Sequence, residues 1–392
     1  MLPLEGLLVV SLEHAIAAPL ATRHLADLGA RVIKIERPEG GDFARAYDKR
    51  ARGVASHFAW CNRSKESLTL DVKHPQANAA LMKLVAKADV VVQNLAPGAA
   101  ARLGLSYETL SARYPRVIVC DISGYGDGGP YLEKKAYDLL IQAESGFLSI
   151  TGTADAPAKA GNSIADISAG MYAYSGILAA LLERGRTGRG RRVDIALLES
   201  MTEWMGYPLY FGLDGASPPP RTGAAHATIY PYGPFKAGDG GSVLLGVQND
   251  REWKMFARLV LQQQPLADDP RFAGNGQRVA HRELIDEIAT AAFAGISITE
   301  LVRRLDEAGI ANGRINDVHE VWNHPQLAAR KRWASVAIPG GEVPAMIPPG
   351  RRDADDVQLG PVPALGQHSR AILAELGYGS ADIEALAAAK AI

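Results

Sequence analysis

Leu7-Leu-Val-Val-Ser-Leu12 opens the chain as a short apolar run, and Arg31-Val-Ile-Lys-Ile35 repeats the pattern after a helical stretch near residues 19–28. Such β-branched runs are typical of buried strands. Two more of them, separated from the first pair by a helical stretch near 76–88, are Val90–Gln93 and Val117–Asp121. Strands that alternate with helices predict an α/β fold built on a doubly wound, Rossmann-like parallel sheet.

The predicted sheet domain covers residues 1–197 and is completed by the C-terminal segment 330–392. A long helix at about 167–184 and the strand-like Arg192–Leu197 close its first part. Beyond them, residues 198–224 are expected to form a connecting helix and a linker, because Gly215-Ala-Ser-Pro-Pro-Pro220 is a stiff breaker. The shorter strands and helices of residues 225–325 predict a smaller α+β domain. Pro339–Pro363 has no helical period and is expected to be extended.

Charge and composition exclude several classes of protein. The 392 residues carry 42 Lys and Arg against 43 Asp and Glu, a formal net charge of -1, so no global field attracts nucleic acid or an anionic membrane. The most apolar stretch, Met171–Leu182, is shorter than the roughly 20 residues that span a bilayer, and no transmembrane segment is expected. Two cysteines without CxxC spacing, Cys61 and Cys120, and the absence of a signal-like N-terminus favour the cytoplasm. Cys61 is expected at a strand edge and Cys120 on a buried strand.

The sequence shows no motif typical of a metal site or of a redox cofactor. The histidines form no HExxH pair, so a dedicated metal site is not expected. Glu13-His-Ala-Ile-Ala-Ala-Pro19 stands where a dinucleotide-binding protein would carry GxGxxG, which disfavours a nicotinamide or flavin cofactor. The glycine-rich Gly124–Pro130 lacks the Lys-Ser/Thr of a phosphate-binding P-loop and is interpreted as a turn.

Asp166 begins a predicted helix, and two interpretations of it stay open. As an N-cap it would only stabilise the helix. As a nucleophile it would be held ionised by the helix dipole, since an ordinary aspartate has a pKa of about 3.9. Its small neighbours, Ala165, Ser168, Ala169 and Gly170, would admit a ligand or serve helix packing alone.

These segments together resemble the class III CoA-transferase family, also called the formyl-CoA transferase and carnitine CoA-transferase family. The resemblance covers nearly the whole chain, and its blocks keep the family's order and spacing. They are Gly29–Pro38, Asn62–Asp71, Val92–Gly98, Ser123–Gly126, Ala136-Tyr-Asp138 with Gln142, Asp166, Thr187–Gly190 and Leu373–Tyr378.

The resemblance implies that Asp166 is the catalytic aspartate. It also implies a CoA-binding groove formed by Ala15, Ile16, Arg37, Leu70, Lys73, Asn94, Leu95, Arg102 and Lys135. CoA carries several negative charges on its phosphates, so cations that are individually unremarkable surface residues would form one site. Coenzyme A and its thioesters are then substrates, and no tightly bound cofactor and no metal are needed. The family further implies an interlocked, ring-like homodimer.

The implied reaction passes through an aspartyl anhydride and an aspartyl-CoA thioester. Succinyl-CoA is the expected donor, and the expected acceptor is a small dicarboxylate such as itaconate, mesaconate or citramalate. Because Ile16 replaces the glutamine of formyl-CoA transferases, a different acid is expected. Tyr137 and Asp138 are candidates near the substrate, and cationic candidates for a second carboxylate are Arg45, Arg50, Arg52 and His226.

Three alternatives share the sequence features. A 2-methylacyl-CoA racemase would use a histidine where this chain has Tyr137, a poor base at neutral pH because an ordinary tyrosine has a pKa of about 10. An isomerase that moves CoA within one dicarboxylate is chemically close to a transferase. A CoA-binding protein without catalysis would not need Asp166.

Overall fold

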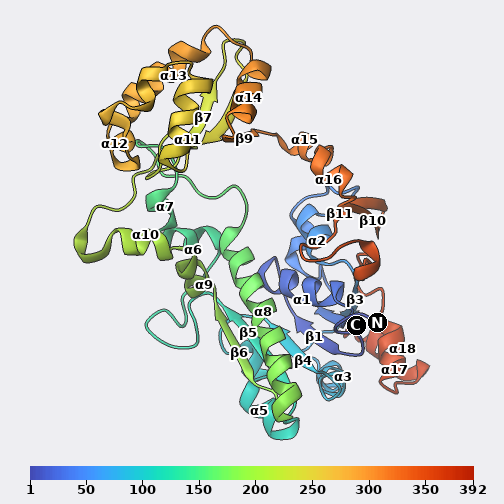
Figure 1. Ribbon diagram of the computed structural model, residues 1–392. Helices are drawn as coiled ribbons and strands as arrows, with labels where there is room; N and C mark the ends of the chain where they lie inside the picture. Colours follow the sequence, from blue (N-terminus) through green and yellow to red (C-terminus); the bar gives the residue numbers. More distant parts are fainter. The chain divides into compact units, whose positions relative to one another are not determined.

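The computed structural model describes residues 1–392 as two compact units, one formed by 1–145, 160–205 and 325–392 and the other by 146–159 and 206–324. The first unit is built on a six-stranded parallel sheet with the strand order β3-β2-β1-β4-β5-β6 (Figure 1). Its strands are β1 (Leu8–Leu12), β2 (Arg31–Glu36), β3 (Lys65–Thr69), β4 (Val90–Gln93), β5 (Ile118–Ser123) and β6 (Arg192–Ala196). The predicted doubly wound sheet is confirmed, and β3 is a strand that the sequence patterns did not mark.

One face of this sheet is covered by helices from both ends of the chain. Alternate strand residues such as Val10 and Ile33 pack there with Leu81, Ile372 and Leu386. The covering helices are α3 (Pro75–Val85), α4 (Ala99–Arg102), α5 (Tyr107–Arg113), α17 (Ser369–Glu375) and α18 (Ser380–Ala388). The C-terminal helices therefore complete the core of the sheet unit, because apolar side chains on one face of a sheet must be buried against another layer.

Helices α1 (Ala17–Asp27) and α8 (Ile164–Thr187) pack against each other in the same unit, and α8 also contacts β5 and β6. Gly170 permits this approach, since a Cβ there would lie 2.7 Å from the carbonyl oxygen of Ala17. By length and composition alone α8 is apolar enough to cross a membrane. Its contacts with α1, β5 and β6 are instead those of a core helix in an α/β unit.

Shorter elements complete the first unit. A hairpin of β10 (Trp333–Ile338) and β11 (Gly341–Met346) packs with Phe58 of α2 (Ser56–Cys61). All of β11 lies in the segment Pro339–Pro363 that was expected to be extended, and residues 341–346 are extended as one strand of this hairpin. The remaining helices of this unit are α6 (Asp138–Glu144), α9 (Leu197–Trp204) and α16 (Pro325–Ala329). Cys120 is buried on β5 as expected, whereas Cys61 ends α2 and does not lie at a strand edge.

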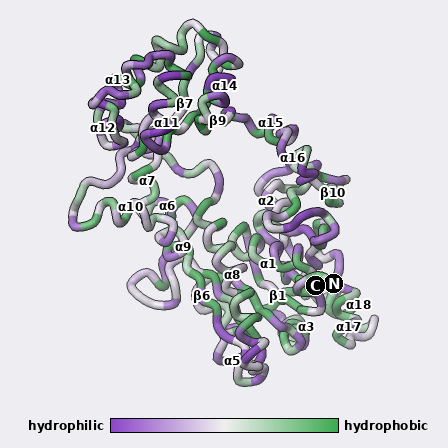
Figure 2. Tube along the Cα trace, viewed as in Figure 1, coloured by the Kyte–Doolittle hydropathy of each residue, from purple (hydrophilic) through white to green (hydrophobic).

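The second unit has its own antiparallel sheet, β7 (Tyr232–Lys236), β8 (Ser242–Gly246) and β9 (Ala311–Arg314). Its core contains Trp253, Phe256, Phe272 and Phe293. The helices around it alternate between hydrophilic and hydrophobic residues, as Figure 2 shows. They are α11 (Asp250–Met255), α12 (Asn275–Ala280), α13 (Arg282–Phe293) and α14 (Ile298–Glu307). The unit also contains α7 (Phe147–Ile150), α10 (Gly206–Phe211) and α15 (Val318–Trp322). The single connecting helix expected within residues 198–224 is thus two helices, α9 and α10.

Candidate active site

The loops after β1 and β4 meet at the carboxyl edge of the sheet. These strands are neighbours, and the chain leaves them toward opposite sides of the sheet order, β2 on one side and β5 on the other. In open α/β sheets, ligands bind in the crevice at such a topological switch point. The Asn94 side chain bridges it by accepting a hydrogen bond from the His14 N–H and donating one to the His14 carbonyl, each 2.9 Å long.

Ala15 continues this loop in a left-handed conformation, with φ of 61°. Its N–H donates to the buried Asp42 carboxylate at 3.1 Å. Non-glycine residues in this region of φ are uncommon and are concentrated at functional sites. The next residue, Ile16, precedes α1 and packs with Leu20 and Cys61, so the loop is held on both sides.

A buried network of charged side chains packs against this loop. Lys34 lies within 2.7 Å of Asp42 and 3.4 Å of Glu13, and Lys65 contacts Glu13 at 2.7 Å. Burial opposes ionisation of both carboxyls, but Lys65 and Lys34 hold the pKa of Glu13 below its ordinary value, and Lys34 does the same for Asp42. Burial also lowers the pKa of Lys65 to about 8. The network is therefore a set of mutually compensated ions, whose partners make burial of each charge tolerable.

The predicted phosphate-binding cations follow strands of this sheet. Arg37 follows β2 and Lys73 follows β3, Arg102 ends α4 after β4, and Lys135 lies in the loop after β5. The Lys73, Arg102 and Lys135 side chains are exposed and form no ion pair, whereas the Arg37 guanidinium donates to the Gly41 carbonyl. Three cationic heads are thus free to meet an anion.

Two other predicted groove residues are apolar. Leu70 is buried in the sheet core and would meet a ligand with its backbone alone. Leu95 is partly buried, and its N–H donates to the side chain of Gln93. Both follow a strand at the same edge as Asn94.

Asp166 lies in the first turn of α8, where Ser163 is the N-cap residue. The N-cap interpretation of Asp166 was therefore wrong by three positions. The carboxylate of Asp166 is partly buried and takes part in no hydrogen bond or ion pair. Burial and then the nearby Asp138 charge raise its pKa from 3.8 to about 7. A carboxylate with this pKa is only about half ionised at neutral pH, so burial opposes the ionised state that was expected at the start of a helix.

Asp138 supplies the cap that Ser163 does not. Its Oδ1 accepts hydrogen bonds from the N–H groups of Ala165 and Asp166, at 2.8 and 3.3 Å. Tyr137, just before it, is 69% exposed and forms no hydrogen bond through its hydroxyl. Of the two neighbouring residues, Tyr137 therefore faces solvent and Asp138 binds the backbone of α8.

His226 belongs to the second unit. Its Nδ1 accepts from the N–H groups of Thr228 and Ile229, at 3.1 and 3.0 Å, and its ring stacks on Tyr232. An Nδ1 that accepts two hydrogen bonds is unprotonated, so the proton of the neutral ring is on Nε2. That nitrogen is the atom through which His226 could bind a carboxylate.

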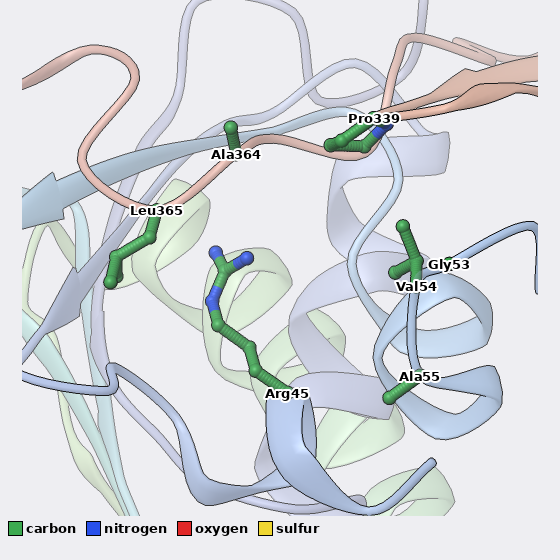
Figure 3. Close-up of a pocket in the computed structure, with 7 residues that line it drawn as sticks. All are labelled: Arg45, Gly53, Val54, Ala55, Pro339, Ala364 and Leu365. Carbon is green, nitrogen blue, oxygen red and sulfur yellow. The ribbon is translucent and has the colours of Figure 1, made fainter. Parts of the chain in front are cut away.

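Arg45 is occupied by internal contacts. Its guanidinium pairs with Glu36 at 2.7 Å and lies over the Phe58 ring, 3.7 Å from its centre. Figure 3 shows the side chain extending toward Ala364 and Leu365, where it lines a cavity of about 220 Å³. Arg50 and Arg52 are exposed and form no ion pair, so of these arginines Arg45 is the one already neutralised.

Two features of the site were missed from the sequence. The network of Glu13, Lys34, Asp42 and Lys65 left a signal, because Lys34 is a charged residue inside a run of strand residues. The hydrogen bonds from α8 to Asp138 left none, since nothing in the chain marks a residue 28 positions away as a helix cap.

A doubly wound sheet with unpaired cations and an unpartnered carboxylate defines an α/β enzyme acting on an anionic substrate. The family model described as CoA-transferase family III matches residues 4–369. The chain is 36% identical to the succinate–glutarate CoA-transferase of Agrobacterium fabrum, over 95% of this chain and 96% of that protein. It is 33% identical to the succinyl-CoA–D-citramalate CoA-transferase of Chloroflexus aurantiacus, over 100% and 98% of the two chains.

A solved structure agrees with these relatives. The crystal structure of a CAIB/BAIF family protein from Brucella suis superimposes with a TM-score of 0.83 at 36% identity, covering 96% of this chain and 99% of that one. The chain belongs to CoA-transferase family III and is an enzyme of that class.

Proposed function

We propose that this enzyme transfers CoA from succinyl-CoA to a short dicarboxylic acid, with Asp166 as the covalent nucleophile. The observation that carries the proposal is the Asp166 carboxylate itself, which is partly buried and accepts no hydrogen bond. Such a carboxylate keeps its lone pairs available for attack once it is ionised. The two named relatives act on glutarate and D-citramalate, which are both short dicarboxylic acids.

The proposed chemistry divides one transfer into four acyl exchanges. An Oδ atom of Asp166 attacks the thioester carbonyl of succinyl-CoA, forming a mixed anhydride and releasing the CoA thiolate. The thiolate then attacks the aspartyl carbonyl, forming an aspartyl-CoA thioester and releasing succinate. The acceptor carboxylate attacks this thioester, which gives a second anhydride and releases the CoA thiolate again. The thiolate then attacks the acceptor's acyl carbonyl, which frees the Asp166 carboxylate and the new acyl-CoA. Water must be kept away from both intermediates.

The groove residues would position CoA for this chemistry. We assign the phosphates to Lys73, Arg102 and Lys135, whose heads are unpaired, and the thiol end to the loop of Ala15 and Ile16. Arg37, Leu70, Asn94 and Leu95 would complete the groove. Backbone N–H groups of this loop would stabilise the tetrahedral oxyanions.

The first test is mass spectrometry of the protein after incubation with succinyl-CoA. Hydroxylamine or borohydride treatment should mark Asp166 in the wild type and leave Asp166→Ala unmarked. Asp194→Asn is a matched control, because burial also raises the pKa of Asp194 although it lies on β6. A wild-type protein that gains no adduct, or an adduct that persists in Asp166→Ala, would contradict covalent transfer by this residue.

Racemisation is the main rival, and a solvent exchange experiment separates it from transfer. A racemase would introduce solvent deuterium at the α-carbon of a 2-methylacyl-CoA, whereas the proposed enzyme would not. The exposed Tyr137 stands where the racemase family carries its histidine. Deuterium incorporation without CoA exchange would replace transfer by racemisation, and CoA exchange within one dicarboxylate alone would indicate the isomerase.

The acceptor class is tested by a screen with succinyl-CoA as donor. Glutarate, itaconate, mesaconate and citramalate should be used at least about tenfold better, in kcat/KM, than formate or acetate, which lack the second carboxylate. If His226 or Arg52 binds that carboxylate, its alanine variant should lose the preference and keep activity with acetate. Equal use of mono- and dicarboxylates would contradict the proposed acceptor class.

The proposed assembly is an interlocked homodimer. Large apolar side chains stand exposed along one stretch of the chain, as an interface would require: Trp204, Tyr207, Leu209, Tyr210, Phe211 and Leu213. A threaded dimer should exchange subunits between tagged and untagged protein only after unfolding. Rapid exchange, or a monomer in sedimentation, would contradict it.

A further inference from the structure

Asp138, Gln142 and the start of α8 form one chain of hydrogen bonds. Gln142 is fully buried, and its Oε1 accepts from the Ala160 N–H at 2.9 Å while its Nε2 donates to Asp138 Oδ2 at 2.7 Å. Asp138 Oδ1 in turn accepts from the N–H groups of Ala165 and Asp166. Both carboxylate oxygens of Asp138 are thus in use, and each contact has one possible donor and acceptor.

We propose that Asp138 is a positioning residue that takes up the N–H donors at the start of α8 and so leaves the Asp166 carboxylate free of hydrogen bonds and aimed at the thioester. The role rests on the proposed function, since it matters for catalysis only if Asp166 attacks. Its physical basis does not depend on CoA. Two carboxylates compete for the same pair of backbone donors, and the one that is hydrogen-bonded is the weaker nucleophile.

The surroundings of Asp166 single out Asp138 as the charge that acts on it. The η1 segment (Phe43–Ala46) is followed by Tyr47, a phenol whose pKa is raised by burial and then by Asp42 and Asp166. From the side of α1, Ile167 is met by Ile16, Leu20 and the Cys61 thiol, whose pKa burial raises to about 12.

Two more ionisable groups lie on elements packed against α8 and α6. Tyr137 is a phenol directly before α6, and Glu199 of α9 acts on Asp194 of β6. Asp138 remains the charged group that raises the pKa of Asp166.

The decisive variants are Asp138→Asn and the exchange Asp138→Asn with Gln142→Glu. In the single variant, the new amide of residue 138 faces the amide of Gln142. At least one of the four hydrogen bonds is then lost, whichever orientation the two amide groups take. In the exchange, the carboxylate at 142 accepts from both Ala160 and the new amide, and every hydrogen bond is restored. The negative charge, however, then lies on residue 142, which is hydrogen-bonded to residue 138 and not to the first N–H groups of α8.

Two readouts separate geometry from charge. The first is the rate of adduct formation from succinyl-CoA at pH 9, where Asp166 is ionised in every variant. We expect Asp138→Asn to be slowed at least about tenfold, and the exchange to return to within about threefold of the wild type. The second is the pH at which the difference in unfolding free energy between each protein and its Asp166→Asn derivative stops growing, because that pH reports the folded-state pKa of Asp166. We expect this pH to fall by about one unit in both variants.

This pH needs no catalysis to measure, so it tests Asp138 even if no adduct forms. If no protein forms an adduct but the wild-type difference stops growing near pH 7 and that of Asp138→Asn at a lower pH, only the proposed function is refuted. A rate and a levelling-off pH in Asp138→Asn that both equal those of the wild type would overturn the positioning role. So would an exchange variant that folds, as judged by circular dichroism, yet stays as slow as the single variant.

Discussion

The side chain of Asn94 closes a two-point clamp on the backbone of His14, accepting from its N–H and donating to its carbonyl at 2.9 Å each. The clamp joins the ends of β4 and β1, and Ala15 next to it is held in a left-handed conformation. The loop expected to meet the thioester is therefore fixed before substrate arrives. Rigid placement of this kind is what makes reacting groups effective.

Removal of the clamp should affect both stability and CoA binding. Asn94→Ala leaves a partly buried N–H and carbonyl unpaired, and we expect a loss of about 1–3 kcal/mol in unfolding free energy and a raised KM for succinyl-CoA. Asn94→Asp keeps the acceptor but sets a carboxylate oxygen against the His14 carbonyl oxygen, so we expect it to destabilise the protein at least as much as Asn94→Ala. Denaturant unfolding and steady-state kinetics check both effects. An unchanged KM in a destabilised Asn94→Ala would limit the clamp to folding.

Asp166→Asn should stabilise the protein at high pH. The folded-state pKa of about 7 exceeds the ordinary 3.8, so the folded protein binds the proton more tightly than the unfolded chain. The contribution of the protonated carboxyl is fully present below pH 4 and is lost as pH rises through 7. We therefore expect Asp166→Asn and wild type to be equally stable near pH 4, with the variant ahead by on the order of 2–4 kcal/mol above pH 8.

Unfolding curves at pH 4, 6 and 8.5 measure this difference. Asp194→Asn is again the control, and because Asp194 is more exposed its difference should be smaller. A difference for Asp166→Asn that is constant with pH would contradict the raised pKa.

Two glycines of α8 should respond in opposite directions to alanine. At Gly170 a Cβ would lie 2.7 Å from the Ala17 carbonyl oxygen, so Gly170→Ala must push α1 away from α8 and should cost about 1–3 kcal/mol. At Gly185, in the same helix, a Cβ meets nothing within 4 Å, and Gly185→Ala should stabilise by about 0.5–1 kcal/mol. Thermal unfolding of both variants compares them directly. Equal effects would show that the helices do not approach as closely as described.

Lys34→Met should be among the most destabilising changes in the first unit. The lysine is fully buried, and its removal leaves Asp42 and Glu13 short of a compensating charge, which should cost about 3–5 kcal/mol. Lys254→Met breaks the exposed pair with Asp268 and should cost far less, because solvent screens the two charges. Denaturant midpoints give both values. A cost for Lys34→Met no larger than that for Lys254→Met would mean that the buried carboxyls become protonated without penalty.

The sequence by itself determined the architecture of the sheet unit. Runs such as Leu7–Leu12 and Arg31–Ile35 are apolar because parallel strands are covered on both faces, and that burial is visible residue by residue. It also placed Arg37 and Asn94 at one edge, since they follow the predicted strands Arg31–Ile35 and Val90–Gln93. Strand β3 was not predicted because it begins with two charged residues, Lys65 and Glu66. Their partners, among them Glu13 and Arg31, lie far away in the chain.

Only the tertiary structure decided the state of Asp166. Local sequence favoured an ionised residue at a helix start, but the donors of that helix bind Asp138, which α6 brings from 28 positions earlier. Burial then raises the pKa of the unpartnered carboxyl to about 7. The periodicity of apolar residues in the sequence indicates which residues are buried. It does not indicate which polar groups compete for one hydrogen-bond donor, because that competition arises only when distant segments pack together.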